Sequence, residues 1–374
     1  MDIFEIPQRI VSGWGVISTI GKEAASLGKK VIIVHSRRLS KSSLLQDAIY
    51  SLNENDCAVM CIDVPSGEPT IEMVEIILKK AERHNCDLVI GIGGGSILDI
   101  AKAVAGLKFT NRTSVKEYFY GHQITNKGIP WVAIPTTSGA GSEATPNSVL
   151  SDEKNIKQSI RGDKSWLASI VILDPQLTVS CSKNVTAWSG MDALTQAIES
   201  YTSIGANVLT EPYSLESAKL IAKSLFKAYE YPEDKQARTD MAQGSLLAGI
   251  ALGNARLGIV HGVAHSIGLH FNVPHGLVCG TLLPWAITYN EKVCSEKYIE
   301  LAKTMKVGNS VNALKNWIIE MNSKMNIPSS IKEFGVTHKD LKQIVMESMP
   351  SGSLKANPRK TSEEELSDFL EKQL

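Results

Sequence analysis

The stretch CDLVIGIGGGS, from Cys86 to Ser96, indicates the fold class of the first half of the chain. An apolar run of strand length ends in glycines, and a helical pattern then extends from Ser96 to Leu107. Such a loop brings backbone N–H groups and the positive end of a helix together, which suits a pyrophosphate. A tight structural turn is the alternative, because Ser96 departs from the G-x-G-x-x-G pattern. The candidate anion-binding residues are Gly93, Gly94, Gly95 and Ser96.

Apolar runs on both sides of this stretch alternate with helical patterns. Strands alternating with helices predict a mostly parallel, doubly wound sheet that binds its ligand at the carboxyl ends of the strands. A second small-residue loop, TTSGAGSE from Thr136 to Glu143, is expected at the same edge and favours a nucleotide. The further predicted strands are KKVIIVHS (29–36), CAVMCIDV (57–64), WVAIPTT (131–137) and SIVILDP (169–175), and helices are predicted at 39–52 and 70–84.

The strand pattern disappears at about Cys181, and the rest of the chain is predicted to be helical. We therefore predict an α/β domain over residues 1–180 and a helical domain over residues 181–374. A last helix is expected after Pro358, where Thr361 and Glu364 have the spacing of a capping box. The other predicted helices are 185–203, 211–229, 235–260, 295–304, 313–325 and 338–349.

The segment VHGVAHSIGLHFNVPHG, from Val260 to Gly276, contains four of the eight histidines of the chain. His261 and His265 are four residues apart, so on a helix they lie on one face. His275 follows a proline that cannot continue a helix, and it is expected to return on a loop. Two imidazoles brought together in this way form half of a metal site, although buried structural histidines are the alternative.

A second candidate for that metal site is GMDALTQAIES, from Gly190 to Ser200. Asp192 and Gln196 are four residues apart on a predicted helix, so a carboxylate and an amide oxygen point the same way. An acidic residue near a helix N-terminus is also favoured by the helix dipole alone. Together with the histidines, however, one aspartate and two imidazoles predict a divalent metal site.

Composition excludes several classes of partner. The 374 residues include 39 Lys and Arg and 39 Asp and Glu, so the formal net charge of zero gives no electrostatic basis for binding nucleic acid or an anionic membrane. The start, MDIFEIPQRI, lacks the apolar region of a secretory signal, and no apolar run reaches membrane length. Six cysteines without C-x-x-C spacing indicate reduced thiols. We expect a cytoplasmic protein that acts on small molecules.

Four motifs, GGGSILDIAK, IPTTSGAGSEAT, GMDALTQAIESY and HGVAHSIGLHFNVPHG, resemble in order and separation the iron-containing (group III) alcohol dehydrogenases. The late NPRKTSEEE is also similar to the C-terminal end of that family, so the resemblance covers nearly the whole chain. It implies an N-terminal dinucleotide-binding domain and a C-terminal helical domain. It also implies a cleft between them for NAD(P) and a divalent metal, and a homodimer or larger assembly.

The resemblance also implies roles for individual residues. Asp192, His261 and His275 would be metal ligands, and His265 would lie near the nicotinamide and the substrate, as a candidate proton relay. Gln196 stands where the family usually has a histidine. The implied cofactor-binding residues are Gly94, Gly95 and Ser96 at the pyrophosphate, Thr136, Thr137 and Ser142 along the cofactor, Lys157 near the nicotinamide ribose, and Asp99, which matches a family acid.

Two departures from the family pattern affect the cofactors. A carboxamide is a weaker ligand than imidazole, so Gln196 leaves Fe²⁺, Zn²⁺ and Mn²⁺ open as the metal. After the first strand, many NAD-using members have an acid, whereas this chain has Ser36 followed by Arg37 and Arg38. Two guanidinium groups without that acid favour NADP(H) over NAD(H), and two solvated surface arginines are the alternative.

The predicted reaction is reversible hydride transfer between NAD(P)H and a small aldehyde or alcohol, with the metal as a Lewis acid. One alternative is an NAD- and metal-dependent lyase or cyclase of the dehydroquinate synthase type. Another is a binding protein without catalysis, in which Gln196 has weakened the metal site. A reductase specific for an anionic aldehyde, carrying a phosphonate or carboxylate, is a further alternative, because Arg161 and Lys164 follow the cofactor motifs.

Overall fold

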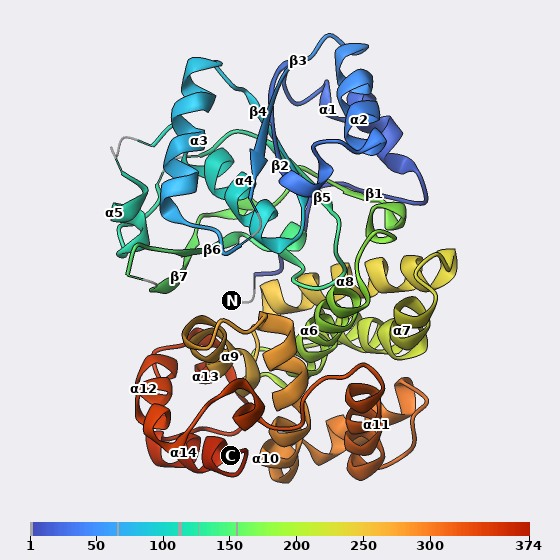
Figure 1. Cartoon of the computed structure of the whole chain (residues 1–374), viewed down its shortest axis with the longest axis vertical. Helices are drawn as coiled ribbons and strands as arrows, with labels where there is room; N and C mark the ends of the chain where they lie inside the picture. Colours follow the sequence, from blue (N-terminus) through green and yellow to red (C-terminus); the bar gives the residue numbers. More distant parts are fainter. Residues whose placement is uncertain (1–2, 66, 111–113, 126, 155) are drawn as a thin grey trace. The chain divides into compact units, whose positions relative to one another are not determined.

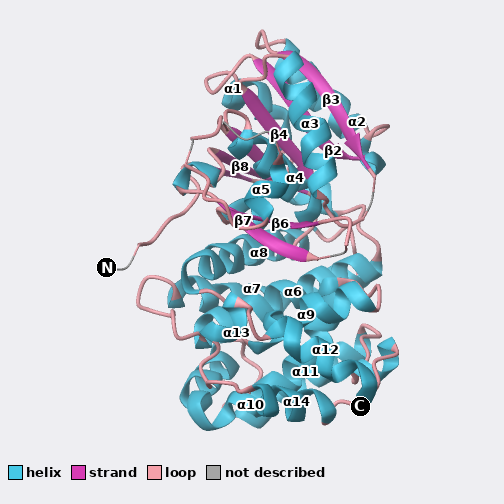
Figure 2. Ribbon diagram, turned by 90° about the vertical axis from the view of Figure 1, so that its left-hand side faces the viewer, coloured by secondary structure: helices cyan, strands magenta, loops and turns pink. Residues whose placement is uncertain are grey.

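Strands and long helices occur in different parts of the computed structural model of the chain, which describes residues 3–65, 67–110, 114–125, 127–154 and 156–374 (Figures 1 and 2). The chain forms two compact units. The α/β unit comprises Glu5–Thr137 and Ser142–Val179, and it contains all the strands of the described residues. The helical unit comprises Ser138–Gly141 and Ser180–Leu374, together with the beginning of the chain.

In the α/β unit, six strands of the described segments form a parallel sheet in the order β1-β8-β5-β4-β2-β3. The chain passes outward from β2 to β3 and then returns to β4 on the other side of β2. Ligands of such sheets bind at the carboxyl ends of the strands where the winding direction changes, here β2 and β4. The strands are β1 (Ile10–Ser12), β2 (Lys30–Ser36), β3 (Ala58–Val64), β4 (Leu88–Gly93), β5 (Trp131–Pro135) and β8 (Ile170–Leu173).

Helices cover this sheet because the sequence supplies both their apolar faces and their caps. In α3 the buried residues recur three or four positions apart, and the Thr70 hydroxyl accepts a hydrogen bond from the N–H of Met73. Side chains of α1 and α2 share one core with β2, β4 and β5. The predicted doubly wound α/β fold is therefore confirmed. Its helices are α1 (Ile20–Ala24), α2 (Ser43–Asn53), α3 (Ile71–Arg83), α4 (Gly95–Leu107) and α5 (Val115–Phe119).

The α/β unit also contains an antiparallel hairpin of β6 (Asn147–Ser151) and β7 (Lys157–Arg161) that the sequence pattern did not predict. The residues NSVLS and KQSIR are largely polar, so they lack the apolar alternation by which a half-buried strand is recognised. β1 was also missed, because three residues are too few to establish a period. Main-chain pairing, rather than apolar burial, defines these strands.

Two hydrophobic cores lie among the described residues of the helical unit, and α10 contributes to both. One lies among α6, α7, α8, α10 and α11, and the other among α9, α10, α12, α13 and α14. The predicted helical second half is confirmed. Its helices are α6 (Lys183–Thr202), α7 (Glu211–Glu230), α8 (Lys235–Ala255), α9 (Ile259–His270), α10 (His275–Thr304), α11 (Val311–Lys324), α12 (His338–Ser348), α13 (Gly352–Ala356) and α14 (Glu363–Glu371).

The start of α10 corrects one prediction, since His275 begins a 30-residue helix instead of lying on a loop. Pro274 takes the N-cap position, where the missing N–H of a proline costs little. The prediction of a helix only from residue 295 was also wrong, because α10 continues through Pro284. A proline removes the hydrogen bond to the carbonyl four residues earlier, here that of Gly280. The Asn322 side chain donates to this carbonyl at 2.7 Å, which compensates for the missing bond.

Two other predicted boundaries were wrong. The helix expected over 235–260 breaks after α8, where Arg256 adopts a positive φ of 67°, and α9 begins at Ile259. The capping box of α14 is formed by Ser362 and Glu365, one residue later than the predicted pair. Each error is local, and neither changes the order of the elements.

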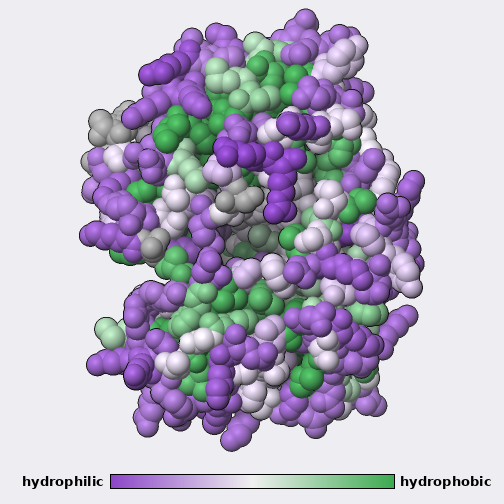
Figure 3. Space-filling model, in the orientation of Figure 1, coloured by the Kyte–Doolittle hydropathy of each residue, from purple (hydrophilic) through white to green (hydrophobic). Residues whose placement is uncertain are grey.

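Among the described residues, no single helix has the length and apolar content needed to cross a membrane. Helices α8 and α9 meet that requirement only as a pair, and they are bent by 106° at the break between them. Hydrophilic residues cover much of the molecular face shown in Figure 3, with smaller apolar areas between them.

Candidate functional site

Three helices of the helical unit bring four potential metal ligands to one point. Asp192 lies on α6, His261 on α9, and His275 and Cys279 lie one turn apart on α10. One ligand atom from each residue lies within 4.8 Å of all the others. His261 Nε2 is 3.2 Å from Asp192 Oδ1, and His275 Nε2 is 3.8 Å from the same oxygen. The structure therefore brings together three of the four residues predicted to bind a metal, Asp192, His261 and His275.

Close packing of α10 against α6 accounts for this convergence. A Cβ on Gly276 would lie 2.1 Å from the carbonyl oxygen of Trp188 and 3.2 Å from the Cβ of Asp192. Only glycine fits there, and this close approach places the start of α10 beside Asp192. A Cβ on Gly280, one turn later, would lie 3.2 Å from the Cβ of Met191, so the two helices are also close there. Substitution of Gly276 would separate His275 from the carboxylate.

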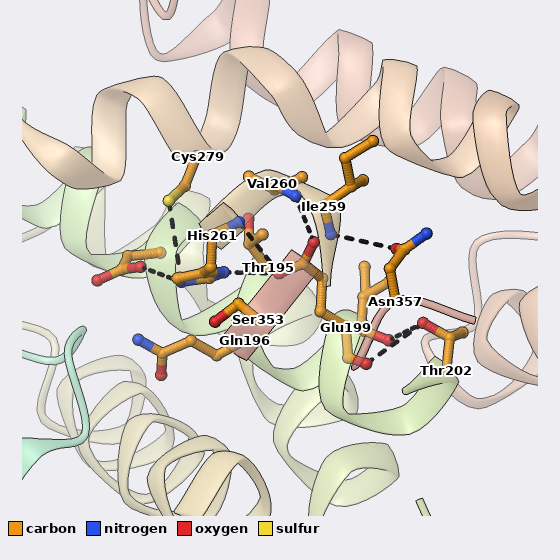
Figure 4. A network of polar contacts seen from close by, with 12 residues as sticks. Thr195, Gln196, Glu199, Thr202, Ile259, Val260, His261, Cys279, Ser353 and Asn357 are labelled. Atoms are coloured by element: carbon orange, nitrogen blue, oxygen red, sulfur yellow. Dashed lines mark hydrogen bonds and ion pairs between the residues drawn. The ribbon is translucent and has the colours of Figure 1, made fainter. Parts of the chain in front are cut away.

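Glu199 holds His261 in one orientation. It lies on α6 seven residues after Asp192, and its Oε2 accepts a hydrogen bond from His261 Nδ1 at 2.7 Å (Figure 4). Both side chains are buried. Because the carboxylate can only accept, the proton of a neutral His261 is placed on Nδ1, and Nε2 presents its lone pair toward Asp192. A carboxylate behind the imidazole is the usual outer partner of a metal-binding histidine.

The same carboxylate caps α9. Oε1 of Glu199 accepts from the N–H of Val260 at 2.7 Å, and Asn357 Oδ1 accepts from the N–H of Ile259 at 3.1 Å. The N-cap residue is Gly258, which has no side chain with which to cap, and a Cβ there would lie 2.8 Å from Glu199 Oε1. The helix that carries His261 is thus anchored by two buried polar side chains from distant parts of the chain.

The electrostatics of the cluster suit a cation. Burial disfavours charge on His261, but Cys279, Asp192 and Glu199 together outweigh this effect and raise the pKa of His261 well above its usual value. For Cys279, by contrast, burial raises the pKa of the thiol, to about 12. Two buried carboxylates therefore draw positive charge to the position that Nε2 of His261 faces. A divalent cation can replace a proton there, so the residues present fit a metal.

Two further predicted residues lie beside this cluster. His265 is one turn after His261 on α9, and its ring stacks on His275 with centroids 4.7 Å apart. Gln196 lies on α6, where its Nε2 donates to the carbonyl of Ala140 at 3.3 Å. The Gln196 oxygen is buried and has no hydrogen-bond partner among the described residues. A role for Gln196 as a metal ligand remains a prediction.

The glycine loop of the α/β unit joins β4 to α4 as predicted. A Cβ on Gly93 would lie 2.5 Å from the Cβ of Ile97, so the strand and the helix can meet only through glycine. Gly94 is the N-cap of α4, and no side chain caps this end of the helix. Gly95 and Ser96 form its first turn. The resulting N-terminus has free N–H groups and the positive end of the helix dipole, which suits an anion.

Thr136 and Thr137 follow β5 next to this loop. The N–H of Thr136 donates to the carbonyl of Gly93 at 2.9 Å, and the Thr137 side chain would contact a Cβ on Gly94. The second small-residue loop thus begins beside the helix N-terminus, as the sequence predicted. These contacts lie wholly within the α/β unit.

Asp99 and Ser142, which were predicted to contact the cofactor, are hydrogen-bonded to each other. Lys102 is fully buried and donates to Ser142 Oγ at 3.1 Å and to the carbonyl of Asn147 at 2.6 Å, while Asp99 Oδ2 accepts from the N–H of Val149 at 3.0 Å. Burial lowers the pKa of Lys102. These hydrogen bonds of Asp99 and Lys102 connect α4 to the hairpin and to the second small-residue loop.

The residues predicted to select the cofactor lie after β2, and Lys157, predicted to lie near the nicotinamide ribose, is on the hairpin. Ser36 ends β2, and Arg37 and Arg38 form a short exposed turn. Arg37 Nε donates to Asp63 Oδ2 at 2.8 Å, and 63 % of its side chain is exposed. Lys157, on β7, forms an ion pair with Glu68 at 2.7 Å.

Glu143, in the second small-residue loop, is the basis of a pH prediction. Burial raises its pKa from 4.5 to about 7, so this group favours folding below pH 4.5 and its contribution is lost as the pH rises toward 7. This difference between the two pKa values of Glu143 corresponds to a loss of at most about 3 kcal/mol in the free energy of unfolding. In the absence of cofactor, Glu143→Gln has no carboxyl group to ionise, so it should not lose this stability as the pH rises. We expect the difference in free energy of unfolding between the variant and the wild type to shift in favour of the variant by about 1–3 kcal/mol from pH 5 to pH 8. Urea denaturation of both proteins at each pH measures this shift. An equal difference in stability between variant and wild type at the two pH values would contradict the prediction.

Glu199, Cys279 and Asn357 were missed by the sequence analysis. Glu199 could have been found, because it follows Asp192 and Gln196 on the same face of α6. Cys279 is recognisable only once His275 is known to begin a helix, since the two are then four residues apart. Asn357 carries no local signal, because its partner lies about 100 residues earlier.

Comparison with known proteins gives the family of the chain. Residues 7–175 match the family model for iron-containing alcohol dehydrogenase, and residues 186–374 match that for the C-terminal part of the Fe-containing alcohol dehydrogenase family. Long-chain-alcohol dehydrogenase 1 of Geobacillus thermodenitrificans (strain NG80-2) is 35 % identical over 356 residues, which are 92 % of this chain and 89 % of the relative.

Two solved structures extend the comparison. A 1,3-propanediol oxidoreductase has a TM-score of 0.95 and 31 % identity over the whole of both chains. The sulfoacetaldehyde reductase from Bifidobacterium kashiwanohense, solved in complex with NAD⁺, has a TM-score of 0.92 and 28 % identity, covering 100 % of this chain and 98 % of the other. The chain belongs to the iron-containing alcohol dehydrogenase family, and it is an oxidoreductase that acts on CH–OH groups.

Proposed function

We propose that this protein is a metal-dependent, NAD(P)H-linked alcohol dehydrogenase that interconverts small alcohols and aldehydes. The observation that carries the proposal is the convergence of Asp192, His261 and His275, because one carboxylate and two imidazoles facing a common point form a site for a divalent cation. The N-terminus of α4, which no side chain caps, supports the binding of a dinucleotide. Family membership favours this reaction over the lyase and the non-catalytic alternatives.

A bound divalent cation would act as a Lewis acid, lowering the pKa of the alcohol so that hydride can leave its carbon. The residues of the chain have separate tasks in this reaction. Glu199 positions His261, and Asp192 supplies the negative charge that holds the cation. His265, stacked on His275, is proposed to pass the alcohol proton to solvent, since an imidazole can exchange a proton near neutral pH.

Purified protein tests this proposal directly. After metal removal, it is supplied in turn with Fe²⁺, Zn²⁺ and Mn²⁺, with NADPH or NADH, and with short-chain aldehydes. We expect aldehyde-dependent oxidation of the cofactor only in the presence of metal. If metal and cofactor both bind but no aldehyde oxidises the cofactor, the proposed activity is wrong.

For the cofactor we propose NADP(H). Arg38 is exposed beside the carboxyl end of β2, and Arg37 is held in the same turn by Asp63. A 2′-phosphate has the charge and the oxygen geometry to bind guanidinium groups. Asp63 competes for Arg37, so the contribution of Arg38 is expected to be the larger.

The variant Arg37→Ala/Arg38→Ala tests the choice of cofactor. We expect the Kd of NADPH to rise by the equivalent of about 1–3 kcal/mol, the range for hydrogen bonds to charged groups, with little change for NADH. Fluorescence titration of both cofactors measures this, and NADH serves as the internal control. A wild-type enzyme whose kcat/KM favours NADH would contradict the proposal even before the variant is made.

An anionic aldehyde is a second candidate substrate. The similarity to a sulfoacetaldehyde reductase favours it, and Arg161, at the end of β7, is a positively charged residue that follows the cofactor motifs in the sequence. The aldehyde panel should therefore include sulfoacetaldehyde beside propanal. A kcat/KM for sulfoacetaldehyde at least tenfold above that for propanal would identify the anionic class, and the reverse order would exclude it.

A further inference from the structure

We propose that Cys279 supplies a fourth protein ligand to the divalent cation held by Asp192, His261 and His275, as a thiolate. The inference rests on the metal site proposed above and assigns the coordination position that Gln196 leaves weak. Its basis is geometric, because the Cys279 sulfur is the fourth member of the cluster of ligand atoms in the helical unit.

The distances within the cluster are close to those of a tetrahedral set, although two of them are somewhat longer. Bond lengths of about 2.0–2.1 Å to nitrogen or oxygen and about 2.3 Å to sulfur place neighbouring ligand atoms roughly 3.3–3.6 Å apart. Cys279 Sγ is 3.5 Å from His275 Nε2 and 3.9 Å from His261 Nε2. His261 Nε2 and Asp192 Oδ1 are 3.2 Å apart. His275 Nε2 and the same oxygen are 3.8 Å apart, and all four ligand atoms lie within 4.8 Å of one another, so the four atoms surround one point and draw closer together when a cation binds.

The position of Cys279 on α10 makes this geometry persistent. Cys279 is one turn after His275 on the same helix and is completely buried, so the cysteine and the imidazole are held on one face. Its sulfur lies between two imidazole nitrogens, yet a thiol has a single proton to donate. His261 Nδ1 donates a hydrogen bond to Glu199, so the other ring nitrogen, Nε2, faces the same point. A cation satisfies all these groups at once.

Gln196 is held differently. Its Nε2 donates to the carbonyl of Ala140, and its oxygen is 3.5 Å from the position of a Cβ on Gly141, so the amide is directed at the segment 138–141 of the same unit. In Figure 4 the labelled Gln196 amide lies apart from the Cys279 sulfur, on the other side of His261. The amide can remain in this bond while Cys279 coordinates the metal.

A thiolate changes the chemistry of the site. Binding releases the thiol proton to solvent as the sulfur–metal bond forms, and two anionic ligands then balance the charge of a divalent ion. A set of one sulfur, two nitrogens and one oxygen favours Zn²⁺ or Fe²⁺ over Mn²⁺, because sulfur is the softer donor. An additional position must open for the substrate, as occurs when zinc becomes five-coordinate.

Cobalt substitution tests the proposal without depending on activity. We expect full-length protein loaded with Co²⁺ to show a thiolate-to-cobalt charge-transfer band in the near ultraviolet. Cys279→Ser should lose this band and bind Zn²⁺ at least about tenfold more weakly in a chelator competition, since loss of even an outer partner costs about 10–100-fold. Cys294→Ser is the matched control, because Cys294 is also buried on α10 but lies outside the cluster. Gln196→Ala should keep the band.

X-ray absorption at the zinc edge of the wild-type protein gives a second readout that needs no variant. It should show one sulfur at about 2.3 Å. Co²⁺ bound by wild type without a charge-transfer band, or a band that persists in Cys279→Ser, would overturn the assignment of Cys279 while leaving the three-ligand site intact. If folded wild-type protein, checked by circular dichroism, binds neither ion, the proposed metal site itself fails and the assignment fails with it.

Discussion

Replacement of His261 by alanine will remove metal binding and activity together. His261 has Glu199 behind it and Asp192 in front of it, so its ring is held in one orientation with Nε2 toward the metal position. Loss of an outer partner alone costs about 10–100-fold in metal affinity, and loss of the ligand itself should exceed about 100-fold. The variant also leaves two buried carboxylates facing each other without a positive charge between them.

Metal content after dialysis, together with aldehyde reduction, measures this result. His270→Ala is the matched control, because His270 lies on the same helix but is exposed and paired with Glu347. We expect wild-type metal content in that control. Circular dichroism should show that the His261 variant is folded. Full metal occupancy in His261→Ala would remove His261 from the set of ligands.

The sequence predicted the α/β part of the fold well because its signals are local. β4 and α4 meet at glycines whose spacing can be read directly, and the buried strands are continuous apolar runs. The hairpin of β6 and β7 could not be predicted from its polar residues, since it is held by main-chain pairing and by the buried Lys102. Local periodicity contains no information about such a partner.

The sequence predicted candidate ligands of the metal site, but it did not predict the residues that hold these ligands in place. Asp192, His261 and His275 stand out by residue type and spacing. The path of α10 through Pro284 depends on Asn322, which lies 42 residues from the carbonyl it satisfies, so no local rule identifies it. The error about where α10 begins also concealed Cys279. The site depends on contacts distant in sequence, and a single sequence does not reveal these.

Glu199→Gln is expected to have an effect nearly as large as loss of His261, although Glu199 does not face the metal position. In the wild-type protein one oxygen accepts from the N–H of Val260 and the other from His261 Nδ1. A glutamine has one oxygen and one NH₂ group, so it cannot accept from both donors. If the oxygen stays with Val260, the NH₂ group faces Nδ1 and favours the tautomer with its proton on Nε2. That proton lies where the metal would bind.

The metal affinity of Glu199→Gln checks this prediction. Glu347→Gln is the control, because Glu347 also accepts hydrogen bonds from residues of α9, namely Ser266 and His270. We expect affinity to fall about 100-fold, the upper end for an outer partner, whereas the control stays near wild type. Loss of the anionic cap should also cost α9 about 1 kcal/mol of stability. The ¹⁵N shifts of the imidazole report the tautomer, and a proton still on Nδ1 with unchanged metal affinity would show that Glu199 only caps the helix.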